Sequence, residues 1–210
     1  MDAKSFFEKF TNRIYSSKYI IEKYWKTDYS TFTEFIMTHI IDEIIKGKEE
    51  KEEAEEYMLS HEYFRIDASG WISNSDDIQH EAKKLDLIPH LWDLKIAVEH
   101  ENNRFDWTDE VIKLMHIRCP LKIVIGYNHS EHRDDESKSD NAKIGAAIDW
   151  MQKVDAFKQV SEDEEFLIIL GNAGKQPPNE NDPCKSIDYR GYLIKKDAEK
   201  GCLNIAARWT

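Results

Sequence analysis

The stretch WDLKIAVEHENN, residues 92–103, combines an apolar strand pattern with two closely spaced acids. Because successive side chains of a strand point to opposite faces, its alternate apolar residues predict one face packed on a core. These residues are Trp92, Leu94, Ile96 and Val98. Glu99 and Glu101 leave on the other face, where two neighbouring carboxylates repel each other unless a cation lies between them. The stretch therefore predicts a strand packed through one side only, with a cation site on its other side.

A second strand-like run, EYFRIDASGW at residues 62–71, divides in the same way. Its predicted core face carries Phe64, Ile66 and Ala68, and its predicted outer face carries Tyr63, Arg65, Asp67 and Ser69. If the two runs are neighbours in one sheet, Asp67 lies on the same side as Glu99 and Glu101. Hard divalent cations prefer oxygen ligands and commonly take one or two carboxylates together with waters and phosphates. We therefore expect Mg²⁺ or Mn²⁺ at these three acids and metal-assisted attack of water on a phosphodiester.

The order of these elements resembles the PD-(D/E)XK superfamily of restriction-endonuclease-like nucleases. The matching pieces are Asp67, the Glu-x-Glu of Glu99 and Glu101, a predicted helix at 106–117 and the apolar run LKIVIGY at 121–127, roughly half of the chain. The resemblance implies an α/β fold with a restriction-endonuclease-like mixed sheet flanked by helices, and catalytic as well as metal-binding roles for the three acids. The chain departs from the family because no Pro precedes Asp67 and Glu101 stands where the family's lysine usually sits.

Other interpretations of the same residues stay open. An antiparallel strand pair with one solvated face also carries Asp and Glu as ordinary solvating groups, and an unrelated α/β fold would place Asp67 far from Glu99. Lys122, on the next strand, is a candidate for a displaced catalytic lysine, although an exposed lysine at a strand end gives the same pattern. His100 points away from the glutamates and is expected to pack or hydrogen-bond beneath the sheet.

Length and composition predict a single domain over residues 1–210, with an N-terminal helical region at 1–56 and an endonuclease-like α/β core at 57–210. The chain shows no run of about 18 apolar residues and no apolar segment of a secretory signal, so we expect no membrane partner. Three cysteines without close pairing are typical of reduced thiols, which favours a cytoplasmic location. A homodimer is implied by the resemblance alone.

The formal net charge of -12 argues against broad nucleic-acid binding, because affinity for phosphates comes mainly from Lys and Arg that displace counterions. Acids concentrated at 49–56, 131–136 and 161–165 leave room for a locally basic surface. The charge motivates a rival hypothesis, a non-catalytic interaction protein that keeps the nuclease-like scaffold and binds a basic protein partner or mimics nucleic acid. The sequence therefore leaves open whether the protein is a Mg²⁺-dependent endonuclease.

Hydrophobic periodicity predicts the remaining elements. The N-terminal region predicts a helical pair, at 4–26 and from Ser30 or Thr31 to Gly47. A turn and a short helix at 78–85 are predicted between the two acidic strands. The C-terminal part predicts a helix at 141–160 and strands at 166–172, 189–194 and 202–209.

Overall fold

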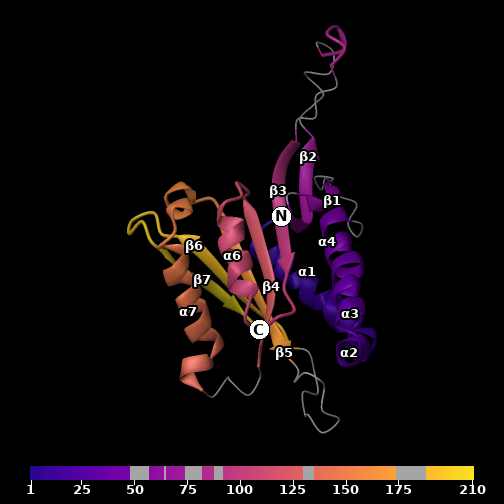
Figure 1. The fold of residues 1–210 in the computed structure, drawn as a ribbon, viewed down its shortest axis with the longest axis vertical. Coiled ribbons are helices and arrows are strands. Elements are labelled where there is room, and N and C mark those ends of the chain that lie inside the picture. Colours follow the sequence, from indigo (N-terminus) through magenta and orange to yellow (C-terminus); the bar gives the residue numbers. More distant parts are fainter. Residues whose placement is uncertain (48–56, 64, 74–81, 88–91, 130–134, 174–187) are drawn as a thin grey trace.

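The computed structural model describes residues 1–47, 57–63, 65–73, 82–87, 92–129, 135–173 and 188–210. Within these residues one mixed sheet has seven strands in the order β1-β2-β3-β4-β5-β6-β7 (Figure 1). The strands are β1 (Met58–Tyr63), β2 (Ile66–Ser73), β3 (Trp92–His100), β4 (Leu121–His129), β5 (Glu165–Ala173), β6 (Arg190–Lys196) and β7 (Leu203–Trp209). The central strands β3, β4 and β5 run parallel, and every other neighbouring pair is antiparallel. The α/β class with a mixed sheet is thus confirmed.

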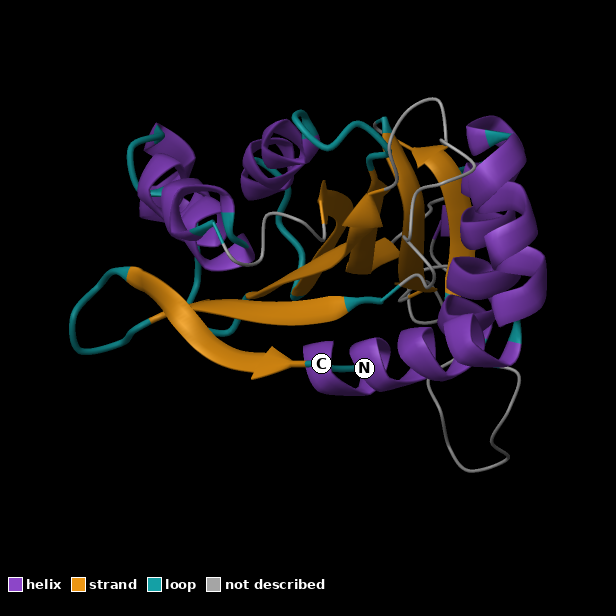
Figure 2. Cartoon of the chain, turned by 90° about the horizontal axis from the view of Figure 1, so that it is seen from below, coloured by secondary structure: helices purple, strands orange, loops and turns teal. Residues whose placement is uncertain are grey.

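Helices cover both faces of this sheet (Figures 1 and 2). One face carries α1 (Ala3–Ser16), α2 (Lys18–Thr27), α3 (Tyr29–Phe35), the π-helix η1 (Ile36–Ile41) and α4 (Asp42–Lys46). The other face carries α6 (Trp107–Met115) and α7 (Asp140–Met151), with two short 3-10 turns, η3 (Glu136–Lys138) and η4 (Asp155–Gln159). Parallel strands need crossover connections, and α6 supplies the one between β3 and β4. The sheet therefore has a buried core on each side.

The N-terminal helical region differs from its prediction at the helix ends. The first predicted helix is divided at Ser17, which ends α1 and precedes α2. The second begins at Tyr29 because the side chain of Asp28 accepts hydrogen bonds from the backbone N–H groups of Ser30 and Thr31. Its predicted end is confirmed, since Gly47 adopts the left-handed conformation with φ 63°.

Residues 62–71 do not form one strand, so the alternation of core-facing and outer-facing residues predicted for them is wrong. A hairpin turn lies inside the run, because β1 ends at Tyr63, β2 begins at Ile66, and Arg65 has a φ of 61°. Ile66 consequently packs in the core beneath α6, whereas Ala68 packs in the core beneath α1–α4. The two predicted core residues thus lie on opposite faces of the sheet. Phe64 lies outside the described residues.

The prediction that β3 packs through one side only is also wrong. Ile96 and Val98 contact the core beneath α1–α4 as expected, but Ala97 is fully buried in the core beneath α6. Glu99, on the same face as Ala97, is only 1% exposed. The physical reason is the crossover, since a helix that joins two parallel strands must lie on the sheet and cover it. The supposed solvated face is a buried one.

The remaining elements follow the predictions more closely. Helix α6 and strands β4, β5, β6 and β7 are present where the pattern places them, with 197–202 joining the last two strands. The predicted helix 141–160 stops at Met151 and is followed by a 3-10 turn. Of the predicted helix 78–85, residues 78–81 lie outside the described part of the chain. None of the described helices is long and apolar enough to cross a membrane.

Candidate functional site

Asp67 and Glu99 come together because β2 and β3 pair antiparallel. The register joins Ala68 to Val98, which places the preceding Asp67 beside Glu99. The Asp67 carboxylate accepts a hydrogen bond from the backbone N–H of His100 at 2.8 Å, which ties the two strands at this point. Glu101 follows β3 and its N–H donates to the carbonyl of Ile125 at 2.9 Å, continuing the β3–β4 ladder. We call Asp67, Glu99 and Glu101 the acidic cluster.

Lys113 of α6 reaches this cluster with its ammonium group. Its ammonium lies 2.8 Å from Oε1 of Glu99, also contacts the carboxylate of Glu110, and donates to the carbonyl of Arg65 at 3.1 Å. Lys113 and Glu110 are three residues apart, so they share one face of α6. The helix that buries Glu99 thus also brings the positive charge that faces it.

Burial raises the carboxyl pKa values throughout the cluster. It raises the pKa of Glu99 to about 8, against the opposing hydrogen bond from Lys113 and with a further contribution from the charge of Asp67. Burial also raises the pKa of Asp67, although the N–H of His100 acts in the opposite direction. The pKa of Glu101 is raised chiefly by burial as well, and its carboxylate accepts the N–H of Asn103 at 2.5 Å. Burial therefore favours the uncharged form of these carboxyl groups, and the contact with Lys113 opposes this effect at Glu99.

The donor set suits a hard divalent ion, since carboxylate oxygens are the ligands that Mg²⁺ and Mn²⁺ favour. The described side chains do not form a complete metal coordination site. Among the described residues no group of three His, Cys, Asp or Glu side chains stands in metal-holding geometry, and the Lys113 ammonium lies against Glu99. An ion at this place would therefore require the side chains of Lys113 or Glu101 to turn away from their present contacts.

Lys122 is not the displaced lysine that its sequence position suggested. It is 1% exposed, and its ammonium donates to Glu164 at 2.7 Å. On β4 it pairs with Ala97, two residues before Glu99, so it lies deeper along the strand than the cluster. Burial lowers its pKa against the opposing effect of Glu164. Lys122 forms a buried ion pair. The alternative prediction, an exposed lysine at a strand end, is therefore also wrong.

His100 behaves as the strand geometry predicts. It is buried on the face opposite the glutamates, where its Nε2 lies 2.8 Å from the hydroxyl of Tyr127 and its ring contacts Phe32. Complete burial lowers its pKa to about 3, so the imidazole is neutral at ordinary pH. The prediction that His100 hydrogen-bonds beneath the sheet is confirmed.

A buried polar cluster that the sequence did not indicate joins α7 to β4, β5 and β6. Arg190 donates through Nε to Asp140 at 2.5 Å and through Nη1 to Asn172 at 2.8 Å. Asp140 also accepts from Asn128 and Tyr192, at 2.7 and 3.0 Å. Burial opposes ionisation of Asp140, but these donors together lower its pKa. The network fixes the start of α7 on the sheet and pairs the charge of Asp140 with that of Arg190, although the buried Nη2 of Arg190 has no hydrogen-bond partner among the described residues.

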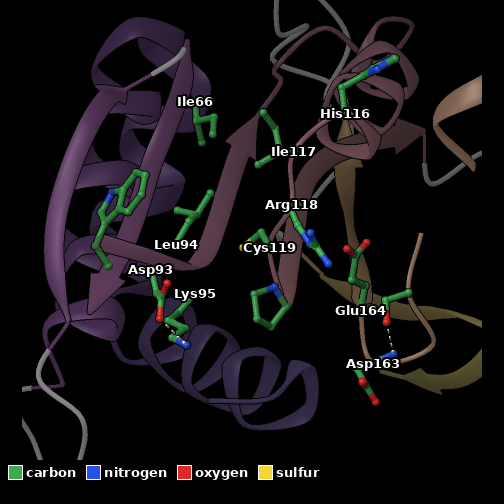
Figure 3. A pocket seen from close by; sticks show the side chains of 13 residues that line it. Ile66, Asp93, Leu94, Lys95, His116, Ile117, Arg118, Cys119, Asp163 and Glu164 are labelled. Atoms are coloured by element: carbon green, nitrogen blue, oxygen red, sulfur yellow. Dashed lines mark hydrogen bonds and ion pairs between the residues drawn. The ribbon is translucent and has the colours of Figure 1, made fainter. Parts of the chain in front are cut away.

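A pocket of about 670 Å³ lies on the α6 side of the sheet (Figure 3). One wall comes from β2 and β3, with Ile66 and Leu94, and the other from the segment 116–120, with Ile117 and Arg118. Residues 161–164 close one end. The walls are largely apolar, and charged groups stand around them.

Comparison of the chain with protein-family models, with curated proteins and with solved structures gave no match. A function for this site therefore has to be argued from its residues. Lys113 and Glu110 were missed by sequence reasoning, although the Glu-x-x-Lys spacing on a helix directly after the acidic strand was a signal that could have found them.

Proposed function

We propose that the protein is a metal-dependent phosphodiester hydrolase that acts on nucleic acid, with Mg²⁺ or Mn²⁺ held by Asp67, Glu99 and Glu101. The observation that carries the proposal is the pairing of Asp67 with a buried Glu99 at the end of β3, where burial raises both carboxyl pKa values. Carboxyl groups with perturbed pKa values are common at functional sites. The elements around them, an acid on β2, Glu-x-Glu at the end of β3, α6 and the apolar β4, follow the order found in the PD-(D/E)XK superfamily.

The residues take distinct roles in this proposal. Asp67 and Glu99 offer oxygen ligands from adjacent strands, and Glu101, which is more exposed, orients or deprotonates the attacking water. A bound divalent ion would lower the pKa of that water and neutralise charge on the phosphate. Lys113 supplies the positive charge that a lysine at position 101 gives in the resembled family. The same proposal includes a restriction-endonuclease-like sheet and a homodimer.

The test is a cleavage assay on labelled DNA and RNA with Mg²⁺ or Mn²⁺. We expect Asp67→Asn and Glu99→Gln to lower the cleavage rate at least about a hundredfold, because each replaces a carboxyl group, which can ionise to bind the metal, with an amide, which cannot. Asp149→Asn is the matched control, since Asp149 is an exposed acid on α7 and its loss should leave the rate unchanged. Circular dichroism checks that each variant keeps its fold. Cleavage by the two cluster variants at the wild-type rate would exclude this mechanism.

A second candidate is the non-catalytic acidic protein that binds a basic protein partner or mimics nucleic acid. Two observations favour it, the net charge of -12 and the contact of the Lys113 ammonium with Glu99, which already gives the buried acid a counterion. Calorimetric titration with Mg²⁺ and Mn²⁺ separates the two. Binding that Glu99→Gln abolishes supports the hydrolase, and no heat, with or without nucleic acid, supports the interaction protein.

A cytoplasmic location is also a proposal. It rests on Cys119 and Cys202, which are free thiols in the described part of the chain. Cys119 is buried, and burial raises its thiol pKa to about 12, so it is a structural thiol and not a reactive one.

A further inference from the structure

The pocket of Figure 3 and the acidic cluster share strands β2 and β3. Ile66, which lines it, directly precedes Asp67 on β2. On the opposite wall Ile117 lies four residues after Lys113, whose ammonium contacts both Glu99 and the carbonyl of Arg65. A polymer that placed one phosphate at the acidic cluster could therefore continue along the sheet into this pocket.

Within the described residues, the exposed Arg118 that lines the pocket has no ion-pair partner, and neither does the exposed Asp163, which lines it as well. Glu164 is neutralised by Lys122 at 2.7 Å, and Asp93 lies 3.6 Å from Lys95. Arg118, by contrast, is exposed and has no ion pair or hydrogen bond to its guanidinium within the described residues. Figure 3 shows it on the wall opposite Leu94. A free guanidinium next to an apolar wall suits a ligand with a flat apolar part and an anionic group, since Arg binds phosphates through a planar fork of donors.

The size of the pocket limits the class of ligand further. A pocket of about 670 Å³ lies in the range that takes a small organic ligand, and a single nucleotide is of this kind. A base in a duplex is stacked and paired, so it can enter a pocket only when it is unpaired or flipped out. The net charge of -12 weakens the broad phosphate attraction to duplex and single strand alike, so it does not choose between them. The size of the pocket and the need for an unpaired base point to a strand whose bases are free.

We propose that this pocket seats one unpaired nucleotide of the substrate, with Arg118 on its phosphate, and that the substrate class is single-stranded nucleic acid. The proposal rests on the proposed hydrolase function and specifies its substrate. The base lies against the apolar wall formed by Ile66 and Leu94, and the strand passes from there to the acidic cluster. Affinity then comes from one seated nucleotide and a local cation, against the repulsion of phosphates by the acidic surface.

The experiment measures fluorescence anisotropy of a labelled oligonucleotide of about ten nucleotides, a length in the range of single-strand binding sites. DNA and RNA strands are each compared with the same strand annealed to its complement. All proteins carry Glu99→Gln, which keeps the bound strand intact in Mg²⁺. We expect the single strand to bind at least about tenfold more tightly than the duplex, because the duplex cannot place a base in the pocket.

Arg118→Ala in this background should weaken single-strand binding about tenfold, the usual effect of losing one charge-assisted hydrogen bond, and Arg118→Glu should weaken it more. Arg118 is exposed, so neither change threatens the fold. Arg208→Ala is the matched control, because Arg208 is an exposed arginine on β7 and its loss removes the same charge elsewhere. Its affinity for the strand should equal that of the Glu99→Gln parent.

Each remaining outcome has a definite meaning. Duplex binding as tight as single-strand binding, equal losses for Arg118→Ala and Arg208→Ala, or no binding of either nucleic acid would each overturn the pocket proposal. A strand that binds through Arg118, but is not cut by the wild-type protein with Mg²⁺ or Mn²⁺, would leave the pocket standing and remove the hydrolase. If the wild-type protein cuts the strand and Arg118→Ala leaves the KM unchanged, the hydrolase proposal stands and the pocket proposal fails.

Discussion

Replacing the buried carboxyl of Glu99 by an amide should remove a pH dependence of stability that the wild-type protein shows. Glu99 is 1% exposed, and burial raises its pKa from the ordinary value of 4.5 to about 8. Between these values the folded protein holds a proton that the unfolded chain has released. The unfolded state then binds fewer protons than the folded state, so the free energy of unfolding falls as pH rises through this window. Glu99→Gln cannot ionise and should lack this fall.

His100 sets the pH interval in which the effect of Glu99 on stability can be measured without opposition. Burial lowers its pKa from 6.5 to about 3, so between those values the unfolded state binds the extra proton and stability rises with pH. This gain opposes the loss from Glu99 below pH 6.5 and is complete above it. From pH 6.5 to about 8 the Glu99 effect acts without that opposition, at about 1.4 kcal/mol per pH unit. The wild-type protein should therefore lose about 2 kcal/mol over this interval.

The assay is equilibrium unfolding in urea at pH 6.5 and at pH 8, in EDTA so that no divalent ion contributes. Glu99→Gln should lose less than about 0.5 kcal/mol between the two pH values, and the exposed-acid control Asp149→Asn should lose as much as the wild-type protein. If the wild-type stability is flat or rises over this interval, or if Glu99→Gln falls in parallel with it, the carboxyl is not held protonated by burial and the reasoning is refuted.

Three further results are expected. Lys122→Met should lower the free energy of unfolding in urea by about 3 to 5 kcal/mol, because Glu164 stays buried without its partner. Adding Glu164→Gln should recover part of this loss. Equal stability of Lys122→Met and the wild-type protein would contradict the prediction. Gly171→Ala should cost about 1 to 3 kcal/mol, since a Cβ there would lie 2.8 Å from the rings of Tyr127 and Tyr189, and an unchanged midpoint would count against that packing. Mn²⁺ at a hundred times its dissociation constant should add about 2.7 kcal/mol to the wild-type protein and nothing to a variant lacking Glu99, as read by thermal unfolding.

Strand and helix positions in the C-terminal part were predictable because their patterns are strong. The run LKIVIGY is apolar at nearly every position, as a strand buried on both faces requires, and it forms β4. Helix α6 follows from the acids in its first turn and the apolar spacing after them. By contrast, the hairpin turn around Arg65 carries no Gly or Pro, so the run 62–71 looked like a single strand.

The pairing of Asp67 with Glu99 was predictable in part. Strand alternation gave the side on which Glu99 leaves β3, but it could not give the register of β2 against β3. The surroundings of these acids could not be predicted from the sequence, because Lys113 approaches Glu99 from a helix fourteen residues later along the chain. Lys122 was misjudged for the same reason, since its partner Glu164 is 42 residues away.

The order of residues along the chain determined the α/β character, most strand and helix positions, and the presence of acids at the end of β3, because these depend on the period of apolar and polar side chains over a few neighbours. The tertiary structure decided that these acids are buried, which lysine faces them and where the pocket lies. Those properties arise only when segments far apart in sequence pack on the same face of the sheet, and local periodicity holds no information about which segments meet.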